Sequence, residues 1–150
     1  MNPAVIAAPI AIIAIIALAS TVEPRTHEST ANELFAITNA SNDAFRLAGL
    51  EKPWPTVHTV APGHSRHKRD TIAYAAIVDT PEGRERRLYI MRDQYRLGME
   101  HITGTIYHEA SHFSIAERYG VHHLASHGPK FSTLCRSITD PVNCTEELHQ

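Results

Sequence analysis

GTIYHEASHFSIAERYG, residues 104–120, is the stretch from which the fold of this 150-residue chain can be worked out. From about Met99 onward, apolar residues recur at steps of three or four, which is the period of an amphipathic helix. These residues are Ile102, Ile106, Ala110 and Phe113. Arg118 lies where a cation suits the helix dipole, and Gly120 is a typical helix end. We therefore predict a helix from about residue 99 to 120 with one apolar face.

The predicted helix carries the string His-Glu-x-x-His at His108, Glu109 and His112. Residues four apart lie on one face of a helix, so the two imidazoles could share one zinc ion. Glu109 would then lie beside the metal, where a carboxylate can take a proton from water and pass it to a leaving amine. The chain has eleven histidines, so the string needs support from its context.

A catalytic zinc site needs a third protein ligand and an open position for water. The metzincin continuation is excluded, because Ile115 and Arg118 stand where that pattern has glycine and histidine. The favoured ligand is His127, in the segment SHGPKF, where the chain could turn back over the metal. The alternatives are two downstream carboxylates and a pair of neighbouring histidines, namely Glu146, Glu147, His122 and His123.

Upstream of this helix, the sequence predicts another helix and a small sheet. Thr30 and Glu33 have the spacing of a capping box, which would begin a helix over residues 31–48. Strands are predicted at residues 56–60, 71–79 and 88–92, and a last helix at 131–138. Trp54, between two prolines, is expected to anchor the core. The predicted fold class is α+β, with a small antiparallel β-meander packed on helices.

Residues 1–29 stand apart from the predicted domain, which spans residues 30–150. The run from Ala4 to Ser20 has no charge and fits the apolar region of a secretory signal or an anchor. No Lys or Arg precedes this run, and the alternative is an N-terminal helix of a cytoplasmic protein. Residues 21–29 then indicate a polar linker.

The cysteine count and the charge limit the possible functions. Cys135 and Cys144 are too few for a four-cysteine zinc ribbon. They could pair in an exported protein, but two buried thiols are the default interpretation. The net charge of −2 gives no global attraction to nucleic acid. A basic group around the predicted hairpin could nevertheless contact DNA phosphates, and it comprises Arg66, Lys68, Arg69, Arg84, Arg86 and Arg87.

HEASH, a gap of fourteen residues and HGPKF together resemble the SprT/Spartan-like zinc metalloprotease domain. That family combines an HExxH helix with an HGxxF segment whose histidine is the third ligand. ELFAITNASNDAF (33–45) and LYIMRDQY (88–95) are also similar to the family's first helix and to the strand before its zinc helix. The resemblance covers about residues 30–140. It implies a zincin-like metallopeptidase core, zinc on His108, His112 and His127, and general acid–base catalysis by Glu109.

The predicted function is therefore zinc-dependent hydrolysis of peptide bonds in protein or peptide substrates. The resemblance adds DNA-associated proteins as one substrate class. The alternatives are a non-catalytic zinc-containing binding module and a DNA-binding accessory protein. Tyr107 and Tyr119 could each stabilise an oxyanion, and the sequence selects neither.

Overall fold

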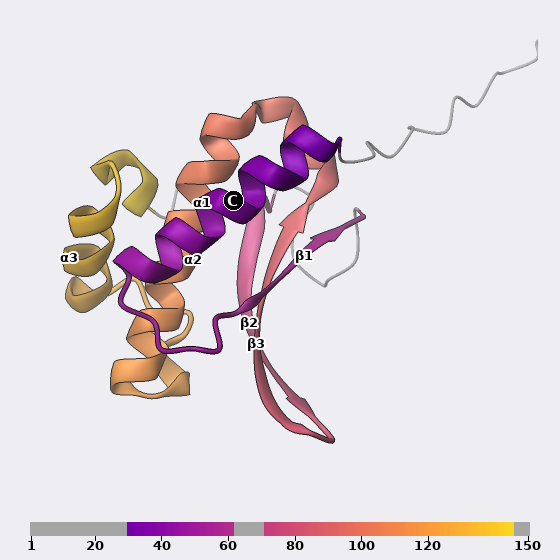
Figure 1. Ribbon diagram of the computed structural model, residues 1–150. Coiled ribbons are helices and arrows are strands. Elements are labelled where there is room, and N and C mark those ends of the chain that lie inside the picture. Colours follow the sequence, from indigo (N-terminus) through magenta and orange to yellow (C-terminus); the bar gives the residue numbers. More distant parts are fainter. Residues whose placement is uncertain (1–29, 62–70, 146–150) are drawn as a thin grey trace, which may run out of the picture.

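Three helices and a three-stranded sheet make up residues 30–61 and 71–145, the part of the chain that the computed structural model describes (Figure 1). The helices are α1 (Ala31–Leu47), α2 (Met99–Tyr119) and α3 (Pro129–Ile138). The strands are β1 (Thr56–Val60), β2 (Ala73–Thr80) and β3 (Gly83–Met91). Short 3-10 turns follow as η1 (Arg92–Leu97), η2 (Val121–His123) and η3 (Pro141–Cys144). The predicted α+β class is confirmed.

The first helix begins as the capping box predicts. The Thr30 hydroxyl accepts a hydrogen bond from the Glu33 amide at 3.2 Å, and the Glu33 carboxylate accepts one from the Thr30 amide at 2.7 Å. These bonds satisfy amides that have no partner inside the helix. Ile37 and Phe45 then point into the core, so α1 packs along α2. Trp54 is half-buried with its ring 6.3 Å from that of Phe45, which confirms its packing role.

Helix α2 is the central element, in contact with α1, the sheet and α3 (Figure 1). The four apolar residues that predict this helix, Ile102, Ile106, Ala110 and Phe113, are all buried. The helix stops at Gly120, whose φ of 105° lies in the region that favours glycine. Among the described residues, no helix has both the length and the apolar character needed to span a membrane.

The sheet differs from the predicted antiparallel meander. Its order is β1-β3-β2, in which β2 and β3 form an antiparallel hairpin and β1 runs parallel to β3. A tight turn before Gly83 fixes the hairpin. The twelve residues from 61 to 72 separate β1 from β2, which is far longer than the connection of a tight hairpin. Strand β1 instead pairs with β3, and Val57 lies beside Leu88 in the core.

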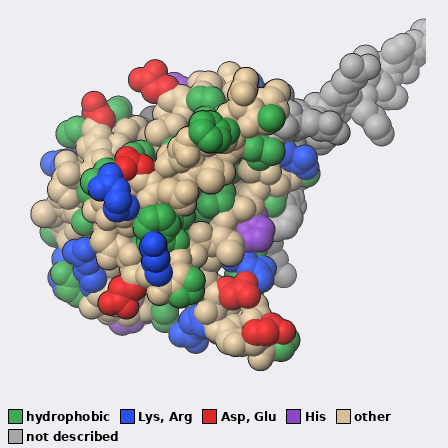
Figure 2. Space-filling view, in the orientation of Figure 1, with side chains coloured by type: hydrophobic (Ala, Val, Ile, Leu, Met, Phe, Trp, Pro, Cys, Tyr) green, Lys and Arg blue, Asp and Glu red, His purple; other side chains and the backbone are tan. Residues whose placement is uncertain are grey.

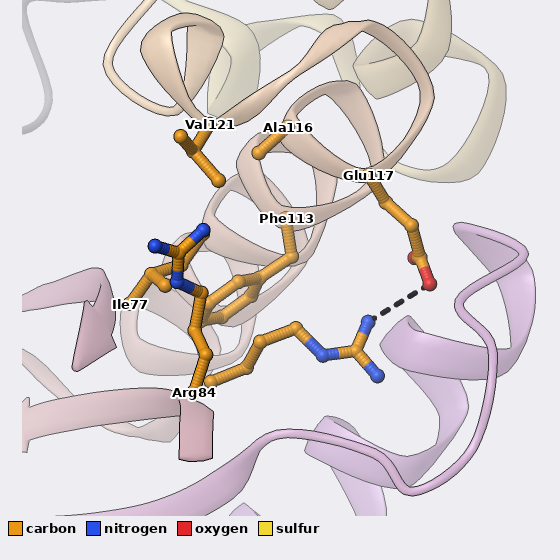
Figure 3. A pocket seen from close by; sticks show the side chains of 7 residues that line it. Ile77, Arg84, Phe113, Ala116, Glu117 and Val121 are labelled. Atoms are coloured by element: carbon orange, nitrogen blue, oxygen red, sulfur yellow. Dashed lines mark ion pairs between the residues drawn. The ribbon is translucent and has the colours of Figure 1, made fainter. Parts of the chain in front are cut away.

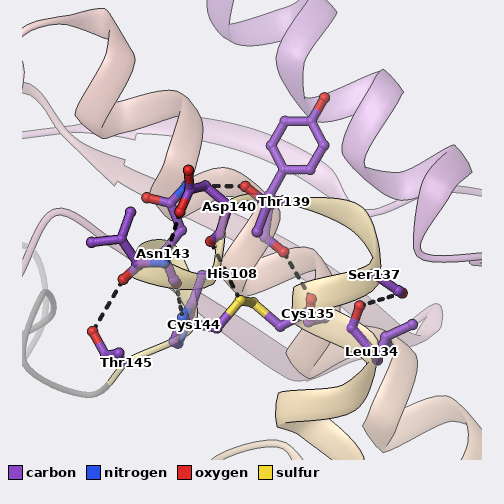
Figure 4. Close-up of a disulfide and its surroundings, with 12 residues drawn as sticks. His108, Leu134, Cys135, Ser137, Thr139, Asp140, Asn143, Cys144 and Thr145 are labelled. Atoms are coloured by element: carbon purple, nitrogen blue, oxygen red, sulfur yellow. Dashed lines mark hydrogen bonds between the residues drawn. A yellow bond between two sulfur atoms is a disulfide. The ribbon is translucent and has the colours of Figure 1, made fainter.

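The two cysteines form a disulfide, so the default interpretation of buried thiols is wrong. Cys135 in α3 and Cys144 in η3 are joined, with their Cα atoms 5.8 Å apart (Figure 4). The pair is buried in a small second cluster with Ile115 and Phe131. The disulfide therefore ties the segment after α3 back onto that helix. The apolar segment of residues 1–29 lies outside the described residues.

Candidate metal centre

The three predicted histidine ligands lie together. His108 and His112 project from one face of α2, while His127 lies in the loop before α3. The Nε2 atoms of His108 and His112 are 3.0 Å apart, and each is 3.1 Å from Nε2 of His127. His108 and His112 are buried and His127 is half-buried. Three imidazole nitrogens therefore converge on one point at the edge of the interior.

The separations between these nitrogens suit one small metal ion. A zinc–nitrogen bond is about 2.0–2.1 Å long, so two nitrogens on one tetrahedral zinc lie about 3.4 Å apart. The separations of 3.0–3.1 Å are close to that value. No fourth His, Cys, Asp or Glu side chain within the described ranges joins the group. The cluster can thus hold a metal on three histidines and leave a further position open.

The ring of His108 is oriented by a backbone carbonyl. Its Nδ1 lies 2.7 Å from the carbonyl oxygen of Asn143 in η3. A carbonyl only accepts hydrogen bonds, so Nδ1–H is the donor and Nε2 carries the lone pair. That lone pair lies toward the nitrogens of His112 and His127. A metal cation is the partner that this tautomer suits.

Phe131 lies against all three histidines. Its ring centroid is 4.7 Å from that of His108, 4.3 Å from that of His112 and 4.9 Å from that of His127. The ring is 1% exposed and also packs on the disulfide. Phe131 therefore restricts the rotation of all three imidazoles and excludes water from one side of the cluster.

Glu109 lies on the sheet side of α2. Its Oε2 accepts a hydrogen bond from the backbone N–H of Ala75 in β2 at 2.8 Å. Burial raises the pKa of Glu109 to about 8, while the Ala75 N–H opposes that shift. A nearby cation would favour the ionised carboxylate. The bond to Ala75 thus fixes one carboxylate oxygen and leaves Oε1 for other chemistry.

A hollow of about 240 Å³ lies farther along the same helix face (Figure 3). Phe113 and Ala116 follow Glu109 by four and seven residues, so they continue its face toward the C-terminus of α2. The other apolar walls are Ile77 and Val121, and the charged lining comes from Arg84, Arg86 and Glu117. The hollow therefore lies on the side of α2 that carries Glu109.

The two neighbouring histidines considered as third ligand do not join the cluster. His122 and His123 pack on each other, with ring centroids 4.2 Å apart, and neither belongs to the group of three. Glu146 and Glu147 lie outside the described residues. Among the histidines that could serve as third ligand, the structure brings His127 to the pair on α2.

Tyr107 and Tyr119 were considered for the oxyanion role. Their side chains contact residues outside the histidine cluster. The hydroxyl of Tyr107 donates to Asp43 on α1, on a different side of α2 from the histidines. Tyr119 is 42% exposed and has the ammonium of Lys130 3.6 Å from its ring centre. Both tyrosines therefore have structural contacts.

The basic group around the hairpin is only partly described. Arg84, Arg86 and Arg87 pair with Asp79, Glu117 and Glu85, respectively. Adjacent residues of a strand point to opposite faces, so Arg86 and Arg87 lie on different sides of the sheet. Figure 2 shows cationic and anionic side chains interspersed over the visible face. Arg66, Lys68 and Arg69 lie outside the described residues.

Three contributions to the site were not predicted from the sequence. Phe131 belongs to the quoted HGPKF motif, yet nothing in the motif assigns its ring a role. The carbonyl of Asn143 and the N–H of Ala75 are backbone groups, which every residue type offers. The strand pattern around Ala75 is the one available signal, because it predicts a strand over residues 71–79.

Comparisons with protein-family models, with curated proteins and with solved structures returned no match. The functional argument therefore depends on the chemistry of the site.

Proposed function

We propose that this protein is a zinc-dependent peptidase that resembles SprT/Spartan-like metalloproteases. The observation that carries the proposal is the convergence of three Nε2 atoms at the helix that also carries the buried Glu109. Three nitrogen ligands are typical of catalytic zinc, whereas structural zinc usually has four protein ligands and often cysteines. The cluster of three histidines therefore favours catalysis over a purely structural metal.

Zinc in such a site acts as a Lewis acid and lowers the pKa of water. The residues of the chain supply the proton transfers. Glu109 takes the proton of the attacking water through Oε1, and it later gives a proton to the leaving amine. The Ala75 N–H holds Oε2, so the carboxylate keeps one orientation during both transfers. The buried rings of Phe131 and His108 limit access of further water.

The edge of β2 supports a peptide as the substrate. The Ala75 N–H bonds Glu109, so Ala75 and its partner Leu88 are a pair without ladder hydrogen bonds. Hydrogen-bonded and non-hydrogen-bonded pairs alternate along antiparallel strands. The backbone N–H and C=O groups of Ile77 and Asp79 therefore also point away from β3. An extended peptide could add to this edge beside Glu109. One of its side chains would reach the hollow lined by Ile77.

The disulfide bears on where this chemistry takes place. Disulfides persist in oxidising compartments and are rare in cytosolic proteins. The Cys135–Cys144 bond therefore adds to the uncharged run from Ala4 to Ser20 in favouring an exported or anchored peptidase. The three described arginines of the basic group are already ion-paired, so DNA is not part of the proposal.

Cleavage of unfolded proteins tests the proposal. We expect the zinc-loaded protein to produce new peptide termini, detected by mass spectrometry, and expect a chelator to stop the reaction until zinc is restored. Glu109→Gln should keep its zinc and lose at least about a hundredfold in rate, because proton transfer is lost. Glu100→Gln, an exposed change in the first turn of the same helix, is the matched control.

Two results would contradict the proposal. Equal cleavage by wild type and Glu109→Gln would point to a contaminating protease. Bound zinc without cleavage of any tested protein would favour the alternative of a non-catalytic zinc-containing module.

A further inference from the structure

The disulfide and the metal cluster meet in one short segment. Asn143, whose carbonyl accepts from His108 Nδ1, is the residue directly before Cys144 (Figure 4). Cys144 is tied to Cys135 of α3, and α3 begins two residues after His127. The backbone carbonyl of Asn143 orients His108, and α3 follows His127. The disulfide therefore anchors the backbone at Asn143 to α3.

The side chain of Asn143 is held as closely as its carbonyl. Its Nδ2 donates to the Thr139 hydroxyl at 3.0 Å. The Asn143 side chain also fills the space over Gly104, which lies one turn before His108 in α2. A Cβ added to Gly104 would lie 2.4 Å from Asn143 Oδ1 and 2.7 Å from its Cγ. Glycine in a helix interior lowers stability relative to alanine. The close contact with Asn143 explains why a glycine occupies position 104.

We propose that Asn143 is a positioning residue that fixes the ring of His108 for metal binding, with the Cys135–Cys144 disulfide and the space over Gly104 holding it in place. The inference rests on the proposed metal centre and extends it to residues that touch no metal. A fixed carbonyl keeps the hydrogen on Nδ1 and the Nε2 lone pair toward the other two histidines. If the segment moves away, the ring can rotate and the nitrogens no longer converge.

Gly104→Ala is the sharpest test, because it displaces Asn143 without altering a ligand. We expect this variant to bind Zn²⁺ about ten- to a hundredfold more weakly than wild type in competition with a chromophoric chelator. The visible absorption spectrum of the Co²⁺-substituted protein should change too, since it reports ligand geometry. Alanine favours helix, so a loss of affinity would come from the displaced Asn143 and not from a weaker helix.

A double variant separates this mechanism from general damage. Asn143→Ala removes the atoms with which the new Cβ collides. Gly104→Ala should therefore cost little further affinity when Asn143→Ala is already present, so the two changes are not additive. Replacing both cysteines by serine should also weaken Zn²⁺ binding. If Gly104→Ala does not fold, the double serine variant is used to test the proposal instead.

The outcomes distinguish this inference from the proposed function. Wild-type protein that binds no Zn²⁺ would overturn the metal centre and this inference with it. Wild-type protein that binds Zn²⁺ while Gly104→Ala or the double serine variant binds it equally well, with an unchanged Co²⁺ spectrum, would overturn the positioning role alone.

Discussion

His108, His112 and His127 share the ring of Phe131 as a neighbour, and that ring is almost completely buried. The Phe131 side chain thus packs in the second apolar cluster and also holds the orientation of the three histidine rings. At the scale of single residues, the site is a set of imidazoles whose orientation depends on one aromatic contact and one carbonyl.

Phe131→Leu should lower both stability and metal affinity. The smaller side chain leaves part of the space beside the imidazoles unfilled, and we expect a loss of about 1–2 kcal/mol in the free energy of unfolding. Zn²⁺ affinity should fall severalfold because the rings gain freedom. Chemical denaturation and chelator competition measure the two effects.

Phe35→Leu is the control for this change, because Phe35 is 70% exposed on α1. It should alter the free energy of unfolding by less than about 0.5 kcal/mol. If Phe131→Leu behaved like Phe35→Leu in both measurements, the supporting role of the ring would be disproved.

At the scale of elements, a polar contact between two side chains joins α1 to α2. The Tyr107 hydroxyl donates to the Asp43 carboxylate. Burial and this bond raise the pKa of Tyr107 to about 12, while the bonds from Tyr107 and Arg46 lower the pKa of Asp43. Both shifts favour the pair of neutral phenol and charged carboxylate. The contact therefore stabilises the packing of the two helices between acidic and alkaline pH.

Tyr107→Phe should lower the free energy of unfolding by about 0.5–1 kcal/mol at pH 7, a modest value because Asp43 is half-exposed. The depressed pKa of Asp43 means that this contribution is present above its unfolded value near 4 and is lost as pH falls through the folded value. The raised pKa of Tyr107 means that the contribution is also lost as pH rises toward 12. Denaturation curves of both proteins across pH measure the difference. A difference that stays constant below pH 4 would contradict this account.

The elements also show which parts of the fold the sequence can predict. Helix α2 follows from its apolar period and from Gly120, and the first turn of α1 follows from Thr30 and Glu33, because these signals are local. The parallel pairing of β1 with β3 is not local, so the predicted antiparallel meander is wrong. Strand β3 also begins at Gly83, five residues before the predicted start at residue 88.

At the scale of the whole molecule, the candidate site joins parts of the chain that are distant in sequence. Two histidines lie on α2, the third lies in the loop before α3, and Glu109 contacts β2. The residue types of the ligands are visible in the sequence. The backbone groups of Ala75 and Asn143 are not, because their roles arise from how the elements pack. A metal on the three histidines would tie α2 to the loop before α3.

The metal content of the purified 150-residue chain tests the central claim most directly. Wild type should carry about one zinc per chain by elemental mass spectrometry, because three converged histidines provide a catalytic-type ligand set. His127→Ala should lose most of that zinc, while His122→Ala, which changes an exposed histidine outside the cluster, should keep it. Wild type without metal after reconstitution, or His127→Ala with wild-type zinc content, would contradict the three-histidine metal centre.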